Sequence, residues 1–319
     1  MASILVVSVA DDSHLPFVQQ HLDEQMLIID TFTFPETGKL TYVTRDGIVS
    51  VIYNGIDLSS VRSVWYRKPA FIKRAQYPVP EEYKEYAHNA YSSGVKLLFD
   101  LLADKFWVSP YQNHMRANNK VLQLAIAQRL GFCVPETIVT NDSTQIEDFQ
   151  DRFPSIVAKP LKFTPLLSED GNSIKAFYAT SIAKGMPLNT SGLHLTPTIF
   201  QQEISPKLDI RITIVGNQVF ACSTTPLGSM ENKADWRTGI TTGQVAYDPI
   251  ELPEEISDKC VRYLRELGLP FGVIELARDA EGIYWFLELN PNGQWAFVEE
   301  NTNIVISKAM AEMLSKGSI

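Results

Sequence analysis

One stretch, residues 271–293, constrains this chain more than any other, because it places oxygen donors on two adjacent predicted strands. An apolar run leads to Glu275, a turn signal follows at Asp279 to Gly282, and a second run of aromatic and branched residues comes after it. Two such runs joined by a short polar turn predict a β-hairpin. The chain must leave the sheet at Pro291, which cannot donate to a strand ladder.

The hairpin predicts a metal site at one end. Glu275, Glu288 and Asn290 would lie close together there. Magnesium takes a few hard oxygen ligands and leaves its other positions to water and phosphate, so two carboxylates and an amide suit it. Two carboxylates facing no cation would otherwise repel each other. On pattern alone, both glutamates fit equally well as solvent-facing positions of alternating strands.

Composition describes an ordinary globular protein with two or three domains, since its 319 residues are 45% hydrophobic and 20% charged. The 37 acidic and 28 basic residues give a net charge of −9, which argues against nonspecific binding to nucleic acid or anionic membranes. Three scattered cysteines indicate neither a disulfide framework nor a zinc site. The chain start lacks a basic n-region, and no apolar run approaches ~18 residues, so we expect a cytoplasmic protein.

The order of predicted elements favours a mixed α/β fold. A continuous branched run at 4–9 reads as a buried strand, and Asp11, Asp12 and Ser13 are candidate caps for the helix after it. A further strand at 61–66 ends at Arg67. We also predict helices at 81–104, 113–130 and 254–267, and strand pairs at 40–53, 208–224 and 271–289. Two polar segments, 162–173 and 226–239, read as mobile loops, the second with the composition of a lid.

Two lysines stand at positions that suit phosphate binding, although lone lysines are usually solvated. Lys120 lies in a predicted helix, and Lys159 ends a short apolar strand. Their order, with Gly131, Pro135 and Thr137 between them, resembles that of ATP-grasp ligases. By this resemblance, both lysines would reach the nucleotide phosphates, and ELNPNG would be the metal-binding segment.

Two further segments extend the resemblance. FQQEIS corresponds to the strand that reads the adenine edge, which makes Gln202, Glu203 and Ile204 the expected adenine contacts, with Lys207 near the ribose. In DIRITIVG, Asp209 and Arg211 share one strand face, and an arginine at this place in the family contacts the triphosphate or the acyl phosphate. A surface ion pair is the plainer interpretation of those two residues.

The combination of VWYRKP, WVSPYQNHMRANNK, DIRITIVGNQVFA and the tripeptide Asp235-Trp236-Arg237 narrows the resemblance further. It is similar to the peptide-modifying ATP-grasp ligases of the microviridin maturase type, the graspetide synthetases, over nearly the full length. This implies an α/β (α+β) ATP-grasp fold in three parts. These are an N-terminal α/β domain at 1–112, a small central domain at 113–197, and a C-terminal antiparallel-sheet domain at 198–319 that carries the metal site.

The resemblance also implies the reaction. Such an enzyme uses ATP and magnesium, with two ions expected, to activate Asp or Glu side chains of a precursor peptide as acyl phosphates. Ser or Thr hydroxyls or Lys amines of the same peptide then close macrolactones or macrolactams. The expected partners are a precursor with a leader and an acidic core, and a second copy of the chain in a homodimer. Arg67, Arg211 and Arg237 are the candidates to hold the acidic core, with Asp209 beside them.

Two departures from the family pattern stand out. Relatives commonly have aspartate where this chain has Glu275, and the segment after Lys159 lacks a glycine-rich run, with Gly171 alone in it. Two other functions stay open: an ATP-grasp ligase that adds a free amino acid to a protein or small acid, and a non-catalytic, nucleotide-gated peptide carrier. The chain has no GxxxxGK[ST], GxGxxG, HExxH or GxSxG motif, and its five histidines show no metal spacing.

Overall fold

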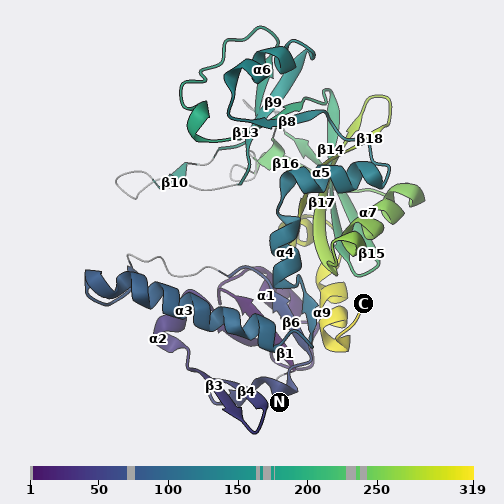
Figure 1. Ribbon diagram of the computed structural model, residues 1–319. Helices are drawn as coiled ribbons and strands as arrows, with labels where there is room; N and C mark the ends of the chain where they lie inside the picture. Colours follow the sequence, from purple (N-terminus) through teal and green to yellow (C-terminus); the bar gives the residue numbers. More distant parts are fainter. Residues whose placement is uncertain are drawn as a thin grey trace.

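The computed structural model describes residues 3–69, 76–162, 166–167, 174–175, 177–227, 235–237 and 243–319. Most of the two predicted loops, at 162–173 and 226–239, lies outside these residues. Figure 1 shows the N-terminal unit at the bottom, the C-terminal sheet in the middle and the central sheet at the top. The separate parallel and antiparallel sheets confirm the mixed α/β class.

The N-terminal unit is built on a parallel sheet. Its strand order is β2 (Leu27–Asp30), β1 (Ile4–Ser8), β6 (Ser63–Tyr66) and β7 (Phe106–Val108). All five residues of β1 are buried, which is typical of a strand covered on both faces. The helices are α1 (His14–Gln19), α2 (Phe34–Thr37) and α3 (Glu81–Leu101). Because the strands are parallel, their carboxyl ends meet at one edge, where Arg67 follows β6 and Ser109 follows β7.

A small antiparallel sheet and a 3-10 turn complete this unit. The sheet contains β3 (Leu40–Arg45), β4 (Ile48–Tyr53) and β5 (Ile56–Asp57), and the turn η1 is Leu58–Ser60. Asp46 and Gly47 have φ of 53° and 78° between β3 and β4, which is the backbone of a tight hairpin turn. The predicted hairpin is confirmed.

The central unit is an antiparallel sheet with one helix. Its strand order is β12 (Thr180–Ala183), β9 (Ser155–Pro160), β13 (Thr198–Gln202) and β8 (Thr137–Thr140). The other elements are α6 (Ser143–Gln150), the short pair β10 (Leu166–Leu167) and β11 (Ile174–Lys175), and the turn η3 (Leu193–Leu195). Strand β13 follows the predicted domain boundary after residue 197 yet pairs with β8 and β9. The three domain ranges stay a prediction.

The C-terminal sheet is antiparallel and five-stranded. Its order is β16 (Val245–Pro249), β15 (Gln218–Pro226), β14 (Lys207–Val215), β17 (Phe271–Asp279) and β18 (Tyr284–Asn290). Helices α5 (Lys120–Arg129) and α7 (Glu254–Glu266) share an apolar core with β14, β17 and β18. Helix α5 therefore packs on the C-terminal sheet although it precedes the central one in sequence.

The prediction of a single helix at 113–130 is wrong in one respect, because two helices occupy the region. Helix α4 (Tyr111–Ala117) ends before Asn118, and the side chain of Asn119 caps α5 by accepting from the backbone N–H of Leu122 at 3.0 Å. Asparagine competes with the backbone for hydrogen bonds, so a pair of asparagines favours a cap over a helix interior.

The last two helices lie between the N-terminal unit and the C-terminal sheet. They are α8 (Ala296–Asn301) and α9 (Ile306–Lys316). One buried cluster contains Ile4 and Trp65 of the N-terminal sheet, Met310 and Leu314 of α9, and Val273 of β17. Figure 1 shows α9, in yellow, beside the N-terminal sheet. Among the described residues, no helix is both long and apolar enough for a membrane span.

Candidate active site

The predicted carboxylate pair lies on the last two strands of the C-terminal sheet, β17 and the edge strand β18. Glu275 of β17 is directly opposite Glu288 of β18, and a bulge follows between Glu275 and Leu276. Since side chains alternate along a strand, Asn290 lies on the same face as Glu288. The predicted hairpin is present, and its three oxygen donors share one face, with Glu275 in the middle of β17 and buried, and Asn290 at the end of β18 and exposed.

Three cations surround Glu288. Lys120, the first residue of α5, donates from Nζ to Oε2 at 2.9 Å, and an Arg237 terminal nitrogen lies 3.2 Å from Oε1. Lys159 of β9 lines the same cavity. Burial alone would raise the pKa of Glu288, but Lys120, Arg237 and Lys159 together hold it well below its usual range. Glu288 is therefore ionised and organises the positive charges around it.

Glu275 has one buried partner. A terminal nitrogen of Arg211 forms an ion pair with it, and the other donates to the carbonyl of Gln294 at 2.5 Å. The guanidinium of Arg211 also lies over the rings of Trp236 and Phe297, at 5.7 and 5.2 Å from their centroids. Burial raises the pKa of Glu275, although Arg211 opposes this. Arg211 is thus held by a carboxylate, a backbone carbonyl and two aromatic rings.

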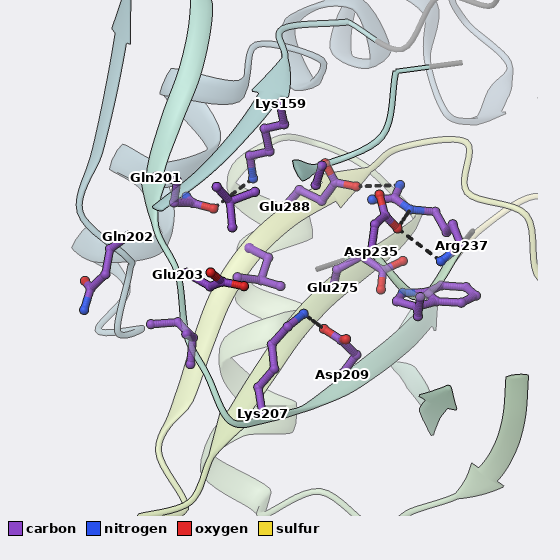
Figure 2. Close-up of a pocket in the computed structure, with 15 residues that line it drawn as sticks. Lys159, Gln201, Gln202, Glu203, Lys207, Asp209, Asp235, Arg237, Glu275 and Glu288 are labelled. Carbon is purple, nitrogen blue, oxygen red and sulfur yellow. Dashed lines mark hydrogen bonds and ion pairs between the residues drawn. The ribbon is translucent and has the colours of Figure 1, made fainter. Parts of the chain in front are cut away.

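Lys159 is held by the central sheet. Its Nζ donates to the amide oxygen of Gln201 at 2.9 Å, and the Gln201 amide nitrogen donates to Thr137 Oγ1 at 2.8 Å. Burial lowers the pKa of Lys159 to about 8. Figure 2 shows Lys159 and Gln201 on one side of the pocket, with Gln202 turned outward. The resemblance predicts Gln202 as an adenine contact and does not single out Gln201, the residue that positions the lysine. Strand alternation on β13 was the signal for it.

Two adjoining cavities are lined by most of the predicted site residues. The smaller, of about 70 Å³, is lined by the predicted adenine and ribose contacts Gln202, Glu203, Ile204 and Lys207, together with Asp209, Glu275 and Glu288. The larger, of about 520 Å³, is lined by Lys120, Lys159, Arg237, Glu288 and Asn290. Lys159, Arg237 and Glu288 line both, so they lie where the cavities meet.

Lys207 and Asp209 form an ion pair at the wall of the smaller cavity, as Figure 2 shows. Burial raises the pKa of Asp209, although Lys207 opposes this. Glu203, which directly follows β13 and lines the same cavity, accepts from Ser181 Oγ of β12 at 2.5 Å. These contacts hold polar groups at the wall where the sequence predicts the adenine and ribose contacts.

Arg67 and Arg211 are the predicted site residues that line neither cavity. The side chain of Arg67 is 1% exposed. Its guanidinium contacts Asp12 Oδ2 at 3.4 Å and donates to the carbonyl of Asn292 at 2.8 Å. Arg67 is therefore not brought to a surface that a peptide could reach.

The donor chemistry fits a hard divalent cation. In the part of the chain that the structure describes, no three His, Cys, Asp or Glu side chains come together as a metal site. The predicted set differs, because it consists of two carboxylates and one amide oxygen. Such a set leaves several coordination positions to water and phosphate, which is how magnesium is usually bound at nucleotide sites.

Family models account for nearly the whole chain. The MvdD pre-ATP grasp domain matches residues 3–115, and the RimK-like ATP-grasp domain matches residues 117–314. This chain belongs to the RimK-like ATP-grasp family. It is therefore an ATP-dependent ligase, and the suspected relationship is confirmed at the level of the family. Comparison with curated proteins gave no match.

Solved structures of ATP-grasp ligases share the fold of this ligase. The macrocyclase MdnC from Microcystis aeruginosa MRC, bound with precursor peptide MdnA, is 24% identical with a TM-score of 0.84, covering 98% of this chain and 99% of that one. A Chryseobacterium gregarium RiPP-associated ligase in complex with ADP, a leader and a core peptide is 24% identical with a TM-score of 0.88, covering 100% and 98%. The ligase PsnB, complexed with a variant minimal precursor, Mg and ADP, is 21% identical with a TM-score of 0.78, covering 99% of each chain.

Proposed function

We propose that this ATP-grasp ligase closes macrocycles in a ribosomally made precursor peptide. The γ-phosphoryl group of ATP passes to an Asp or Glu side chain and leaves ADP and an acyl phosphate. A Ser or Thr hydroxyl or a Lys amine of the same peptide attacks the carbonyl carbon, loses its proton and expels phosphate. The product is a macrolactone or macrolactam that has lost one water per ring.

The observation that carries this proposal is the joining of an MvdD pre-ATP grasp domain to a RimK-like ATP-grasp domain in one chain. The relatives MdnC, the Chryseobacterium ligase and PsnB are each described in complex with a precursor or with leader and core peptides. They match this chain from end to end, N-terminal unit included. A ligase for free amino acids would share the nucleotide residues but has no evident use for a peptide-ligase N-terminal domain.

We assign the nucleotide to the smaller cavity and its mouth. Gln202, Glu203 and Ile204 would contact adenine, and Lys207 would lie near the ribose. The lysines Lys120 and Lys159 would meet the phosphates where the two cavities join. This assignment is supported by the lining residues of both cavities. Phosphoryl transfer depends mostly on positioning and charge neutralisation, which is what such residues provide.

Glu275, Glu288 and Asn290 would hold magnesium, and we expect two ions. The support is chemical, because two directly opposed carboxylates and an amide on one face form a hard-oxygen set. When bound, magnesium would neutralise the outer phosphate oxygens. The chain's own part is to keep Glu288 ionised, through Lys120 and Arg237, so that it stays a ligand at neutral pH.

We assign the acidic core of the peptide to the larger cavity. Arg237 is the candidate to hold the reacting carboxylate, since its side chain is 40% exposed and it lines this cavity. Arg211 is the candidate for the acyl phosphate, with Asp209 beside it on β14. The burial of Arg67 argues against its predicted contact with the peptide. Charge complementarity of this kind lets an acidic enzyme accept an acidic substrate through a local basic patch.

Mass spectrometry of a peptide reaction tests the function. The substrate is the short peptide, rich in Thr and in Glu or Asp, that we expect to be encoded beside this gene, incubated with enzyme, ATP and Mg2+. Loss of one water per ring supports macrocyclisation, gain of an amino acid supports the amino-acid ligase, and an unchanged mass supports the peptide carrier. Arg237→Ala should abolish the water loss, and unchanged cyclisation would remove Arg237 from the site. We further expect a cytoplasmic enzyme and a homodimer. Light scattering of the purified enzyme would test the homodimer.

A further inference from the structure

The segment from Pro291 to Ala296 follows the β17–β18 hairpin and contacts the carboxyl edge of the N-terminal sheet. Strand β1 lies between β2 and β6. The strands after β1 are therefore added first on one side of it and then on the other, and the strand order reverses at this point. In open parallel sheets the crevice at such a place, beside the carboxyl ends of the strands, is where ligands bind. In this ligase, backbone of the C-terminal unit occupies it.

Three side chains of that edge hold the backbone of the segment. Ser109 Oγ donates to the carbonyl of Pro291 at 3.0 Å, and Arg67 donates to the carbonyl of Asn292 at 2.8 Å. His14 Nε2 accepts the backbone N–H groups of Trp295 and Ala296, at 3.0 and 3.1 Å. All three side chains are buried, so these bonds are formed away from water. Buried hydrogen bonds to backbone fix its conformation because an unpaired group there is costly.

His14 has one protonation state that satisfies these contacts. Because Nε2 accepts two N–H groups, it carries no proton, so Nδ1, which lies 2.8 Å from Asp12 Oδ1, carries the proton of the neutral ring. A terminal nitrogen of Arg67 also lies against the ring, 2.9 Å from Nδ1 and 3.2 Å from Nε2. Burial lowers the pKa of His14, although the bond to Asp12 opposes this, while Arg67 and Lys68 lower it further. Asp12 also contacts Arg67 Nε at 3.4 Å. One carboxylate therefore orients both the imidazole and the guanidinium.

The held segment bears directly on the nucleotide and metal residues. Asn290 immediately precedes it, and the carbonyl of Gln294 within it accepts from Arg211 at 2.5 Å. A shift of the segment would move Asn290 and release one of the groups that orient Arg211, the carbonyl of Gln294. The N-terminal edge is thus connected to the site through the six residues 291–296.

We propose that His14, Arg67 and Ser109 are positioning residues, which hold residues 291–296 in the conformation that places Asn290 in the proposed metal set and orients Arg211 against Glu275. This inference rests on the proposed function, because it takes Asn290 as a metal ligand. It gives the N-terminal unit a part in metal binding, besides any part in binding a peptide.

The test measures ADP binding by calorimetry, with and without Mg2+, in the full chain. His14→Ala and Ser109→Ala should lose roughly tenfold to hundredfold in Mg2+-dependent affinity, as loss of an orienting partner usually does. The Mg2+-free affinity should change less. His14→Gln should regain most of the loss, because its amide oxygen can accept the same two N–H groups. His21→Ala is the matched control, since His21 is exposed near the end of the same helix.

Two outcomes overturn the inference. One is wild-type Mg2+-dependent affinity in the folded His14→Ala and Ser109→Ala proteins. Another is an equal loss with and without Mg2+ that His14→Gln does not restore, which would mean a structural role only. If thermal melting shows that His14→Ala does not fold, Ser109→Ala decides, because it removes a single hydroxyl. A wild-type enzyme that binds Mg2+ and ADP but leaves the peptide unchanged would refute the proposed function and leave this inference standing.

Discussion

Two charged clusters of this ligase contain the same kinds of side chain in opposite settings. The cleft cluster is Glu288 with Lys120, Lys159 and Arg237, and it lines the cavities. The edge cluster is Asp12, His14 and Arg67, and it lines neither. The Arg237 side chain is 40% exposed, whereas that of Arg67 is 1% exposed.

The difference lies in how each cluster balances charge. In the cleft cluster Lys120, Lys159 and Arg237 face Glu288, and Asp235 is a second carboxylate paired with Arg237. Three cations against two carboxylates leave positive charge over for an anionic ligand. In the edge cluster Arg67 meets a carboxylate and a backbone carbonyl, and no charge is left over. Excess charge beside a cavity indicates binding, whereas balanced charge in a buried place indicates positioning.

Removing the carboxylate of the cleft cluster should have the largest effect. Glu288→Gln leaves three cations without their shared anion and removes a proposed metal ligand. We expect ATP turnover with peptide to fall roughly hundredfold to thousandfold, the usual cost of losing a group that stabilises charge in the transition state. Glu281→Gln, in the exposed turn of the same hairpin, is the control. Turnover near the wild-type rate in Glu288→Gln would show that the cations do not depend on this carboxylate.

Gly293 tests the connection between the clusters. A Cβ at this position would lie 2.4 Å from the side chain of Val273, closer than real contacts allow. Gly293→Ala should therefore displace the segment at an overpacking cost of about 1–3 kcal/mol, and lower Mg2+-dependent ADP affinity about tenfold. Gly192→Ala is the control, because Gly192 has a φ of −97° and open space around it. Unchanged affinity with a lowered melting temperature would confine the effect to stability.

Within the cleft cluster, a local pattern singled out Glu288, whereas Lys120, Lys159 and Arg237 were predicted through the resemblance to ATP-grasp ligases. Glu275 and Glu288 lie on paired strands of one hairpin, and a hairpin's register follows from its turn. The edge cluster could not be predicted in this way, because Asp12, His14 and Arg67 meet only when the parallel sheet has formed. Asp12 looked like a helix cap, and His14 like one of five unremarkable histidines. A cue was present, since polar residues directly after buried parallel strands converge at one edge.

Trp236 tests how far Arg211 depends on its surroundings. The tryptophan is 4% exposed and lies within 5.7 Å of the guanidinium, next to Arg237 in the chain. Trp236→Leu removes a cation–π contact, which stabilises by about 0.5–2 kcal/mol. We expect kcat for ATP turnover with peptide to fall severalfold in Trp236→Leu. It should fall less in Trp236→Phe, because phenylalanine keeps an aromatic face. Equal losses in the two variants would mean that the ring fills space and does not orient Arg211.

The smallest expected effect is a pH dependence in the cleft cluster. Burial lowers the pKa of Lys159 to about 8, so its ammonium loses its proton as the pH rises through that value. Bound phosphate favours the charged form and raises this pKa, so the complex holds more protons than the free enzyme near pH 8. Metal-free ADP affinity should therefore fall severalfold as the pH rises from about 7 to 9, with proton uptake on binding that calorimetry in two buffers would measure.

The Lys159→Arg enzyme should bind ADP with little pH dependence and no proton uptake in this range, because arginine stays charged. The control is Lys184→Arg, at an exposed residue directly after β12, which should behave as wild type. Proton uptake that persists in Lys159→Arg would assign the titration to another group of the cleft, and the edge cluster, which has no excess charge to lose, should contribute none.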